Sequence, residues 1–193
     1  MINTIIFDFG NVFINIDIEG AIIKSLARLK IREFPSDILC CNKDYEQGLI
    51  STYEFLEFYK KRFNHLSENE LINLWNSLIM DFPKYRLQFL KKLKATKNYK
   101  LILLSNTNQL HINHIKKQIT FYEEFKNYFD AFYLSHEINL RKPTKAIFQF
   151  IIDDNNLNPK NCMFIDDNAD NIKTANSMYF KTWHIQPDQE DVI

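Results

Sequence analysis

Five short apolar runs, each followed by a polar segment, constrain the fold of this chain more than any other feature. The runs lie at Thr4–Phe7, Leu101–Leu104, Ala131–Leu134, Cys162–Ile165 and, more weakly, Lys181–Ile185. Their apolar residues are continuous rather than alternating, which is typical of parallel strands covered on both faces. Helices are predicted between them at about 83–97, 108–127, 144–155 and 169–178. The alternation predicts an α/β fold with a Rossmann-like parallel sheet.

The residues after the first predicted strand interrupt this alternation, because no convincing strand follows for some sixty-five residues. Apolar residues recur there at helical spacing, in Ile22–Leu29 and in Phe55–Phe63. Ser67 and Glu70 have the spacing of a capping box that begins a further helix. We therefore predict two domains, an α/β core of residues 1–17 and 83–193 and a small helical cap of residues 18–82.

The charge and the cysteines exclude several classes of protein. Lys+Arg and Asp+Glu both number 24, so no net charge attracts nucleic acid or an anionic membrane. The three cysteines, of which Cys40 and Cys41 are adjacent, do not form a disulfide framework. No apolar stretch has the length of a membrane-spanning helix, and we expect no signal peptide. We expect a cytoplasmic protein without nucleic acid or membrane partners; the sequence indicates no oligomeric state.

Four polar clusters lie at the ends of predicted strands or the beginnings of predicted helices. Each has a structural explanation when taken alone. Gly10-Asn11 is a good turn pair, Ser105–Asn108 suits a helix N-cap, and Pro143 suits the first position of a helix. The carboxyl ends of parallel strands meet at one edge of a sheet, where ligands bind. The four clusters in this order therefore predict a single crevice.

The residue types in these clusters indicate phosphate and metal chemistry. A basic pair, Arg141-Lys142, precedes a predicted helix, and a cation beside a helix N-terminus is suited to phosphate. The run Asp166–Asn171 collects carboxylates that repel one another unless a hard divalent cation lies among them. It does not fit a calcium loop, because the position that requires Gly holds Asn171.

These motifs resemble those of the haloacid-dehalogenase (HAD) superfamily, and the likeness covers nearly the whole chain. Phe7–Val12 is similar to its first motif, Leu104-Ser105-Asn106 to its second, Lys142-Pro143 to its third and Phe164–Asp167 to its fourth. The helical insertion lies where that family carries its first type of cap, C1. Within the family, the likeness is greatest to bacterial α-D-glucose-1-phosphate phosphatases, which share the Leu-Ser-Asn-Thr-Asn and Arg-Lys-Pro runs.

The resemblance implies a magnesium-dependent phosphatase that hydrolyses a small phosphorylated metabolite, such as a hexose 1-phosphate, through an aspartyl-phosphate. It implies that Asp8 is the nucleophile and that Lys142 is also catalytic. The implied phosphate-binding residues are Ser105, Asn106 and Lys142. The implied Mg²⁺ ligands are Asp8, the carbonyl of Gly10, Asp166 and Asp167. Two alternatives remain open: a metal-independent 2-haloacid dehalogenase and a weakly active, phosphate-binding regulatory protein.

Two departures from the family matter. Gly10 stands where most of its phosphatases have a second Asp that protonates the leaving group. We therefore predict a preference for glycosyl phosphates, because an anomeric hydroxyl is more acidic than an ordinary alcohol. Asp17 is a candidate substitute acid, with helix capping as an equal explanation. Tyr179 replaces a usual Gly after the last core helix, and we expect an effect on packing alone.

Some side chains of the insertion and of the following helix have alternative interpretations. Tyr45, Tyr53 and Trp75 either line the substrate pocket or form the core of the cap. His111 and His114 lie one helical turn apart without a nearby acidic partner, so we interpret both as helix surface rather than metal ligands.

Overall fold

Five parallel strands form one sheet, in the order β3-β2-β1-β4-β5, in a computed structural model that describes residues 1–193. The strands are β1 (Thr4–Phe7), β2 (Lys100–Ser105), β3 (Ala131–Leu134), β4 (Cys162–Asp166) and β5 (Lys181–His184). Each lies within one residue of a predicted run. The predicted Rossmann-like parallel sheet is confirmed.

The central strand, β1, is the point at which the strand order reverses. The chain adds β2 and β3 on one side of β1 and then crosses over to add β4 and β5 on the other side. Phe7 is paired in register with Leu103 of β2 and with Ile165 of β4. Asp8 therefore lies between the carboxyl ends of two neighbouring strands, at the switch point where such sheets bind ligands.

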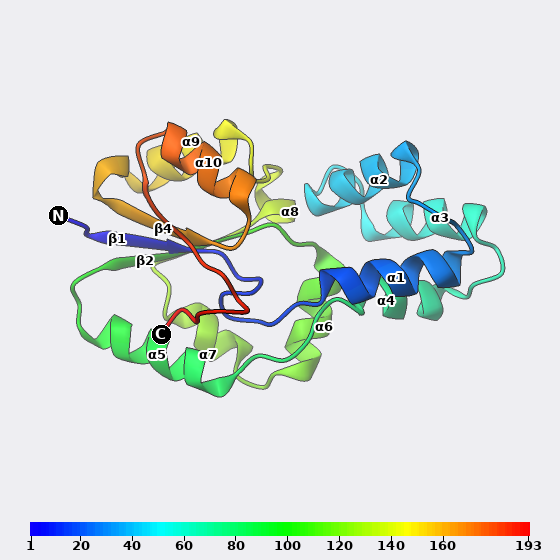
Figure 1. Cartoon of the computed structure of the whole chain (residues 1–193), viewed down its shortest axis with the longest axis horizontal. Helices are drawn as coiled ribbons and strands as arrows, with labels where there is room; N and C mark the ends of the chain where they lie inside the picture. The colour runs from blue at the N-terminus through cyan, green and yellow to red at the C-terminus, as the bar shows by residue number, and fades with distance from the viewer.

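Helices cover both faces of the sheet (Figure 1). One face carries α5 (Lys84–Ala95), α6 (Gln109–Gln118) and α7 (Tyr122–Asn127), and the other carries α9 (Lys145–Asn155) and α10 (Ala169–Ser177). Two short helices, α8 (Ser135–Ile138) and a 3-10 turn (Pro159–Asn161), complete the core. No helix of the chain combines the length and the apolarity needed to cross a bilayer.

The single helix predicted at 108–127 is wrong, because the chain forms two helices there, α6 and α7. The backbone is extended at Ile119. Ile119 and Thr120 are both β-branched, and β-branched residues favour this conformation over a helix. The break lets α7 place Phe125, which is fully buried, against Phe9 and Phe13.

The continuous apolarity of the strands is explained by the two faces of the sheet. In β2, Leu101 and Leu103 belong to the cluster under α5–α7, whereas Ile102 and Leu104 belong to the cluster under α9 and α10. Successive side chains of a strand point to opposite faces, so a strand covered on both faces needs apolar residues at every position. All four of these side chains are fully buried.

A helical lobe lies beyond the carboxyl ends of the strands, separate from the layers that cover the sheet (Figure 1). It consists of α1 (Ile18–Leu29), α2 (Ser36–Glu46), α3 (Thr52–Arg62) and α4 (Glu68–Asn76). The lobe has its own apolar cluster, which includes Tyr45 and Phe55. Both bonds of the predicted Ser67–Glu70 capping box form at the start of α4, and an unpredicted one, Ser51–Glu54, starts α3.

Two paired segments connect the lobe to the sheet. Ile16 and Ile79 form an antiparallel bridge, and the Asp17 N–H donates to the Leu78 carbonyl at 2.9 Å. The N–H of Asn15 donates to the carbonyl of Asp81 at the same distance. The chain therefore leaves and re-enters the core through one short two-stranded ribbon.

The lobe also contacts the core directly beside α8. The Asn139 side-chain amide donates to the carbonyls of Gln47 and Gly48 at 3.1 Å, and Ser135 Oγ donates to the carbonyl of Glu46 at 2.5 Å. Gly48 has a φ of +70°, and a Cβ there would lie 2.1 Å from the carbonyl oxygen of His136. This close backbone approach requires glycine.

Tyr179 provides a test of backbone strain. Its φ is +68°, the ring is 71% exposed, and Lys160 Nζ lies 5.7 Å from the ring centroid. We expect Tyr179→Gly to raise the free energy of unfolding by about 0.5–1 kcal/mol, because glycine adopts this conformation without a steric cost. Tyr179→Ala keeps that cost and is the control. Chemical denaturation measures both, and equal stability of the two variants would contradict the explanation.

Candidate active site

A buried ammonium group joins three of the residues predicted for the site. Lys142 Nζ lies 2.7 Å from Asp8 Oδ1 and 2.6 Å from Asp166 Oδ2. Asp8 follows β1, Asp166 ends β4, and Lys142 precedes α9, so sequence positions far apart meet at one point. Lys142 is 1% exposed and Asp166 is fully buried. A buried charge of this kind is stable only when it is paired, so the three side chains hold one another in place.

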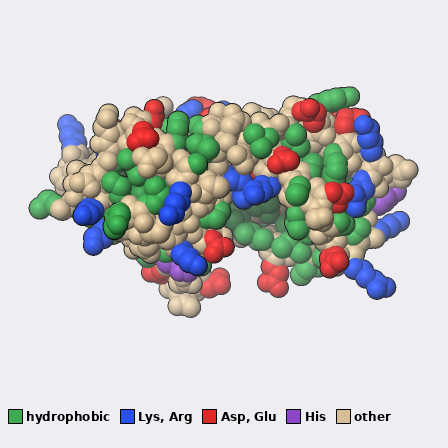
Figure 2. Space-filling model, turned by 90° about the horizontal axis from the view of Figure 1, so that it is seen from above, with side chains coloured by type: hydrophobic (Ala, Val, Ile, Leu, Met, Phe, Trp, Pro, Cys, Tyr) green, Lys and Arg blue, Asp and Glu red, His purple; other side chains and the backbone are tan.

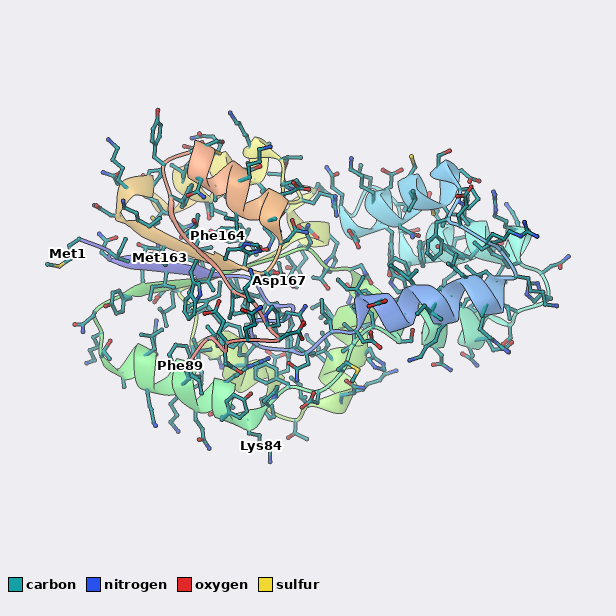
Figure 3. All side chains as sticks on the ribbon, in the orientation of Figure 1. Met1, Lys84, Phe89, Met163, Phe164 and Asp167 are labelled. Carbon is teal, nitrogen blue, oxygen red and sulfur yellow. The ribbon has the colours of Figure 1, made fainter.

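Three carboxylates gather at this point and form the carboxylate cluster: Asp8, Asp166 and Asp167. One oxygen from each lies within 4.8 Å of the others. Figure 3 shows Asp167 at the end of the sheet that faces the helical lobe. Asp170, which the sequence places in the same acidic run, is exposed in the first turn of α10 and does not join the cluster.

Amide side chains orient the cluster. Asn171 Nδ2 donates to both oxygens of Asp166 at 3.0 Å, and the N–H of Asn168 donates to Asp166 Oδ1 at 2.8 Å. Asn11 Nδ2 donates to Asp167 Oδ2 at 2.8 Å. Asn11 has a φ of +54°, a conformation that Asn tolerates better than most residues.

The second predicted cluster supports the lysine through its backbone. Asn106 Oδ1 accepts from the N–H of Lys142, and Asn106 Nδ2 donates to the carbonyl of Lys142, both at 2.9 Å. The amide side chain therefore positions Lys142. Ser105 is 2% exposed, with its hydroxyl 3.4 Å from the carbonyl of Asn106.

A cavity of about 340 Å³ opens over the cluster, and all four predicted polar clusters contribute to its wall. Asp8, Gly10, Asn106, Lys142 and Asp167 line it on the core side, whereas Ser105 and Asp166 are not among the lining residues. The lobe and its connections close the opposite side, and Figure 2 shows a hollow between the two halves of the molecule.

Some backbone donors of the residues around the cavity are free. The N–H groups of Gly10 and Asn106 are among those that donate no hydrogen bond to another protein atom. Polar backbone groups that lack a protein partner are uncommon at buried positions, and these two residues line the same cavity as Lys142. The wall of the cavity therefore offers donors to an anionic ligand.

The electrostatics of the site reflect this crowding of like charges. Burial raises the pKa of Asp8 to about 7; Lys142 opposes this shift, and Asp166 and Asp167 increase it. Burial raises the pKa of Asp167 as well, against the hydrogen bond from Asn11. Burial lowers the pKa of Lys142, but Asp166 and Asp8 outweigh it, so the net shift is upward. A cation beside the carboxylates would favour their charged forms.

Asp17 does not reach the site. Its Oδ1 accepts from the N–H of Gly20 at 2.7 Å as the N-cap of α1, and the residue does not line the cavity. The capping explanation is therefore the one that the structure supports. The structural explanation of Pro143, as the first residue of a helix, is wrong. Thr144 is the N-cap of α9 and Lys145 is its first residue.

The interpretation of His111 as helix surface is wrong. The ring is 6% exposed and stacks on Trp75, with the centroids 5.3 Å apart. Its Nε2 lies 3.1 Å from the carbonyl of Trp75, so Nε2 carries the proton, and Nδ1 accepts from Asn108 Nδ2. The helical lobe covers this face of α6, which sequence spacing alone does not reveal.

The aromatic residues proposed for the pocket lie elsewhere. Tyr45 and Trp75 belong to the apolar cluster of the lobe, where the Tyr45 ring stacks on Phe55 at 4.2 Å. Tyr53 is 73% exposed. None of the three lines the cavity over the carboxylate cluster.

Sequence reasoning missed two groups of the site. Asn11 follows Gly10 in sequence and is typical of a turn, and its place after the first predicted strand is the one signal for a role in the site. Glu46, the last residue of α2, reaches the cavity and pairs with Arg141 at 2.9 Å. No sequence signal separates Glu46 from any other charged residue at a helix end.

Comparison with known proteins agrees with this geometry. Residues 2–178 match the family model described as haloacid dehalogenase-like hydrolase. The chain is 28% identical to the D-ribitol-5-phosphate phosphatase of Bacteroides thetaiotaomicron over 95% of its own length and 91% of that protein's.

Solved structures are similar as well. A haloacid dehalogenase family enzyme from Bacteroides thetaiotaomicron, in complex with magnesium and inorganic phosphate, superposes with a TM-score of 0.84 at 31% identity, over 98% of this chain and 97% of that one. A predicted family hydrolase from Porphyromonas gingivalis gives 0.81 at 25% identity, over 95% and 90%.

The buried ring of His111 predicts a pH-dependent stability. Burial lowers the pKa of His111 to about 4, whereas the pKa in the unfolded chain is near 6.5. The neutral ring therefore contributes its full stability above pH 6.5, and this contribution is lost as the pH falls towards 4. We expect this residue to account for a loss of up to about 3 kcal/mol of unfolding free energy over that range.

The measurement compares wild type with His111→Gln by denaturant unfolding at several pH values. The stability difference between the two should shrink as the pH falls from 7 to 4. His114→Gln, on the same helix but half-buried, is the matched control and should change this dependence much less. A difference that stays constant with pH contradicts the prediction.

Proposed function

The chain belongs to the haloacid dehalogenase-like hydrolase family and is a phosphatase; from this we propose a magnesium-dependent hydrolysis of a small phosphorylated sugar through an aspartyl-phosphate on Asp8. The observation that carries the proposal is the position of Lys142 Nζ, which lies within 2.7 Å of both Asp8 and Asp166 and belongs to a residue that lines the switch-point cavity. A nucleophile, a cation and an acidic pair in one crevice match the requirements of phosphoryl transfer.

Asp8 is the proposed nucleophile. Its Oδ1 accepts from Lys142, whereas Oδ2 accepts no hydrogen bond from the protein and is available to attack phosphorus. A bond forms between Oδ2 and phosphorus as the ester P–O bond breaks, and the leaving oxygen departs as an alkoxide that takes a proton from water. A second water molecule then attacks phosphorus, which releases phosphate and a proton and restores the Asp8 carboxylate. Covalent catalysis of this kind divides a difficult displacement into two easier steps.

The donor set fits Mg²⁺. Asp8, Asp166 and Asp167 supply hard carboxylate oxygens within 4.8 Å of one another, and one ammonium does not neutralise three carboxylates. We propose Asp8, Asp167 and the carbonyl of Gly10 as direct ligands, with Asp166 beside them. When bound, Mg²⁺ offsets the repulsion between the phosphate dianion and the Asp8 carboxylate.

The phosphoryl oxygens have proposed partners on three sides. Lys142 supplies the positive charge, and the free N–H groups of Gly10 and Asn106 supply two further donors. Ser105 remains a prediction as a phosphate ligand, since its hydroxyl lies near the carbonyl of Asn106. Fixed donors that surround the transferred group are the main source of rate acceleration in this chemistry.

The helical lobe is the proposed cap, with boundaries at 17/18 and 82/83. Its residues form one side of the cavity, and the paired ribbon that contains Ile16 and Ile79 is the only covalent route to the core. A cap in this position excludes bulk water and chooses among substrates.

Position 10 supports a substrate with a good leaving group. A Cβ on Gly10 would lie 3.0 Å from Ile16 Cδ1, so an acidic side chain at this position would have to displace the end of a neighbouring apolar side chain. The Asp17 carboxylate accepts from the N–H of Gly20 as a helix cap and does not reach the cavity. We therefore propose a glycosyl phosphate, such as a hexose 1-phosphate, in preference to a sugar alcohol 5-phosphate of the kind hydrolysed by the Bacteroides relative.

Two experiments distinguish the proposed phosphatase from a metal-independent dehalogenase and from a regulatory phosphate-binding protein. A metal-independent dehalogenase has no need for the Asp166–Asp167 pair, and a chelator would leave its activity unchanged. A regulatory phosphate-binding protein would bind phosphate but show no turnover. The acidic pair and the intact Asp8–Lys142 contact favour the phosphatase over both.

A substrate panel tests the function. We expect magnesium-dependent release of phosphate from hexose 1-phosphates, less from sugar alcohol 5-phosphates and least from alkyl phosphates. Asp8→Asn should reduce kcat by roughly 10³-fold or more while the protein stays folded by circular dichroism. A clear preference for alkyl phosphates would contradict the leaving-group argument, and full activity of Asp8→Asn would overturn the nucleophile.

Magnesium binding is tested by thermal stability. A ligand that binds only the folded state raises Tm by mass action, so Mg²⁺ should stabilise wild type and EDTA should reverse the effect. Asp167→Asn should reduce the shift at least by half. Asp170→Asn, which removes an exposed carboxylate three residues away, is the matched control and should retain it. Equal shifts in both variants would exclude Asp167 as a ligand.

A further inference from the structure

A single ion pair joins the helical lobe to the core inside the site cavity. Glu46 ends α2, and Arg141 directly precedes Lys142. Arg141 Nη2 donates to Glu46 Oε2 at 2.9 Å, and both residues line the cavity that contains Asp8. Their side chains are 28% and 22% exposed, so the pair is shielded from solvent without being sealed off.

Glu46 differs from the other carboxylates of the cavity wall. Asp8 and Asp167 belong to the carboxylate cluster, whereas Glu46 comes from the opposite wall and is paired with an arginine. The other residues of the lobe in the wall are Ile18 and Leu78, which are both apolar. Glu46 is therefore the one polar side chain through which the lobe can contact the part of a substrate beyond its phosphate.

The pair has unused hydrogen-bonding capacity. Arg141 Nε is buried without a partner, and Glu46 Oε1 accepts no hydrogen bond from the protein. A buried donor without a partner costs free energy that a ligand can recover. A carboxylate accepts from one hydroxyl group while a guanidinium donates to the next, which is the pattern presented by vicinal hydroxyls.

We propose that Glu46 and Arg141 are the specificity-determining residues of this site and bind neighbouring hydroxyl groups of a polyhydroxylated phosphate ester. This inference rests on the proposed phosphatase function and names the part of the substrate that the cap recognises. The phosphate lies against Lys142, and the hydroxyl-bearing carbons extend towards the lobe. Simple alkyl and aryl phosphates lack these hydroxyls and gain nothing from the pair.

Two other roles for the pair lead to different observations. The first is Glu46 as a proton donor to the leaving group: burial raises the pKa of its carboxyl, and the ion pair with Arg141 opposes this shift, so kinetics must separate this role from binding. A latch that only holds the lobe closed is unnecessary at this position, because Asn139 already ties Gln47 and Gly48 to the core outside the cavity.

The experiment measures kcat and KM with Mg²⁺ for four substrates: a hexose 1-phosphate, a sugar alcohol 5-phosphate, propyl phosphate and p-nitrophenyl phosphate. We expect Glu46→Gln and Arg141→Lys to lower kcat/KM for both polyhydroxylated esters about ten-fold or more, mainly through KM. The effect on propyl and p-nitrophenyl phosphate should be at least five-fold smaller, by the same hydroxyl argument.

Asn139→Gly is the matched control for a latch. Asn139 has a φ of +55°, which glycine accepts, so this variant removes the two side-chain hydrogen bonds to Gln47 and Gly48 without adding backbone strain. It should change all four substrates by a common factor. If Glu46→Gln behaves in the same way, the pair is a latch and the inference is overturned.

Loss of kcat for propyl phosphate and the sugar esters, with p-nitrophenyl phosphate spared, would identify Glu46 as an acid and also overturn the inference. Calorimetry can make the same comparison without turnover. It measures the affinities of Asp8→Asn protein, with and without Glu46→Gln, for a sugar alcohol 5-phosphate and for propyl phosphate. If the wild-type protein hydrolyses none of the four substrates, the proposed function is overturned. If Glu46→Gln weakens the binding of the two ligands to Asp8→Asn protein equally, only this inference is overturned.

Discussion

The ammonium of Lys142, buried between Asp8 and Asp166, is the interaction on which the site depends. Without it, three carboxylates would lie within 4.8 Å of one another with no compensating charge. With it, the carboxylates still outnumber the ammonium by two, which is the state that a divalent cation relieves. The fold supplies the geometry, because Asp8 follows β1, Asp166 ends the adjacent β4, and Asn106 holds the backbone of Lys142 with two hydrogen bonds.

The strands and the members of the carboxylate cluster were predictable from sequence for one physical reason. A parallel strand covered on both faces needs unbroken apolarity, so Leu101–Leu104 is conspicuous, and the polar residues that follow such a run must lie at the binding edge of the sheet. The position of Glu46 was not predictable, because it depends on how the lobe packs against α6 and α8. The burial of His111 escaped prediction for the same reason, since a neighbour distant in sequence covers it.

Residues that cap helices and residues that bind ligands are of the same chemical types, and the structure separates them by their hydrogen bonds. The Asn168 side chain accepts from two N–H groups of α10 and is a cap, whereas Asn171, three residues later, donates to Asp166. Asp17 caps α1. Gly10 is a different case, because a catalytic side chain there would have to displace the end of Ile16.

The ribbon that contains Ile16 and Ile79 has a mechanical consequence. Two hydrogen-bonded strands resist sliding past each other more than bending out of their common plane, so the ribbon favours a hinge-like displacement of the lobe over a sliding one. A Cβ on Gly10 would lie 3.0 Å from Ile16 Cδ1, so the ribbon also packs against the loop that follows Asp8. A displacement of the lobe is therefore coupled through one side chain to the loop that carries Gly10.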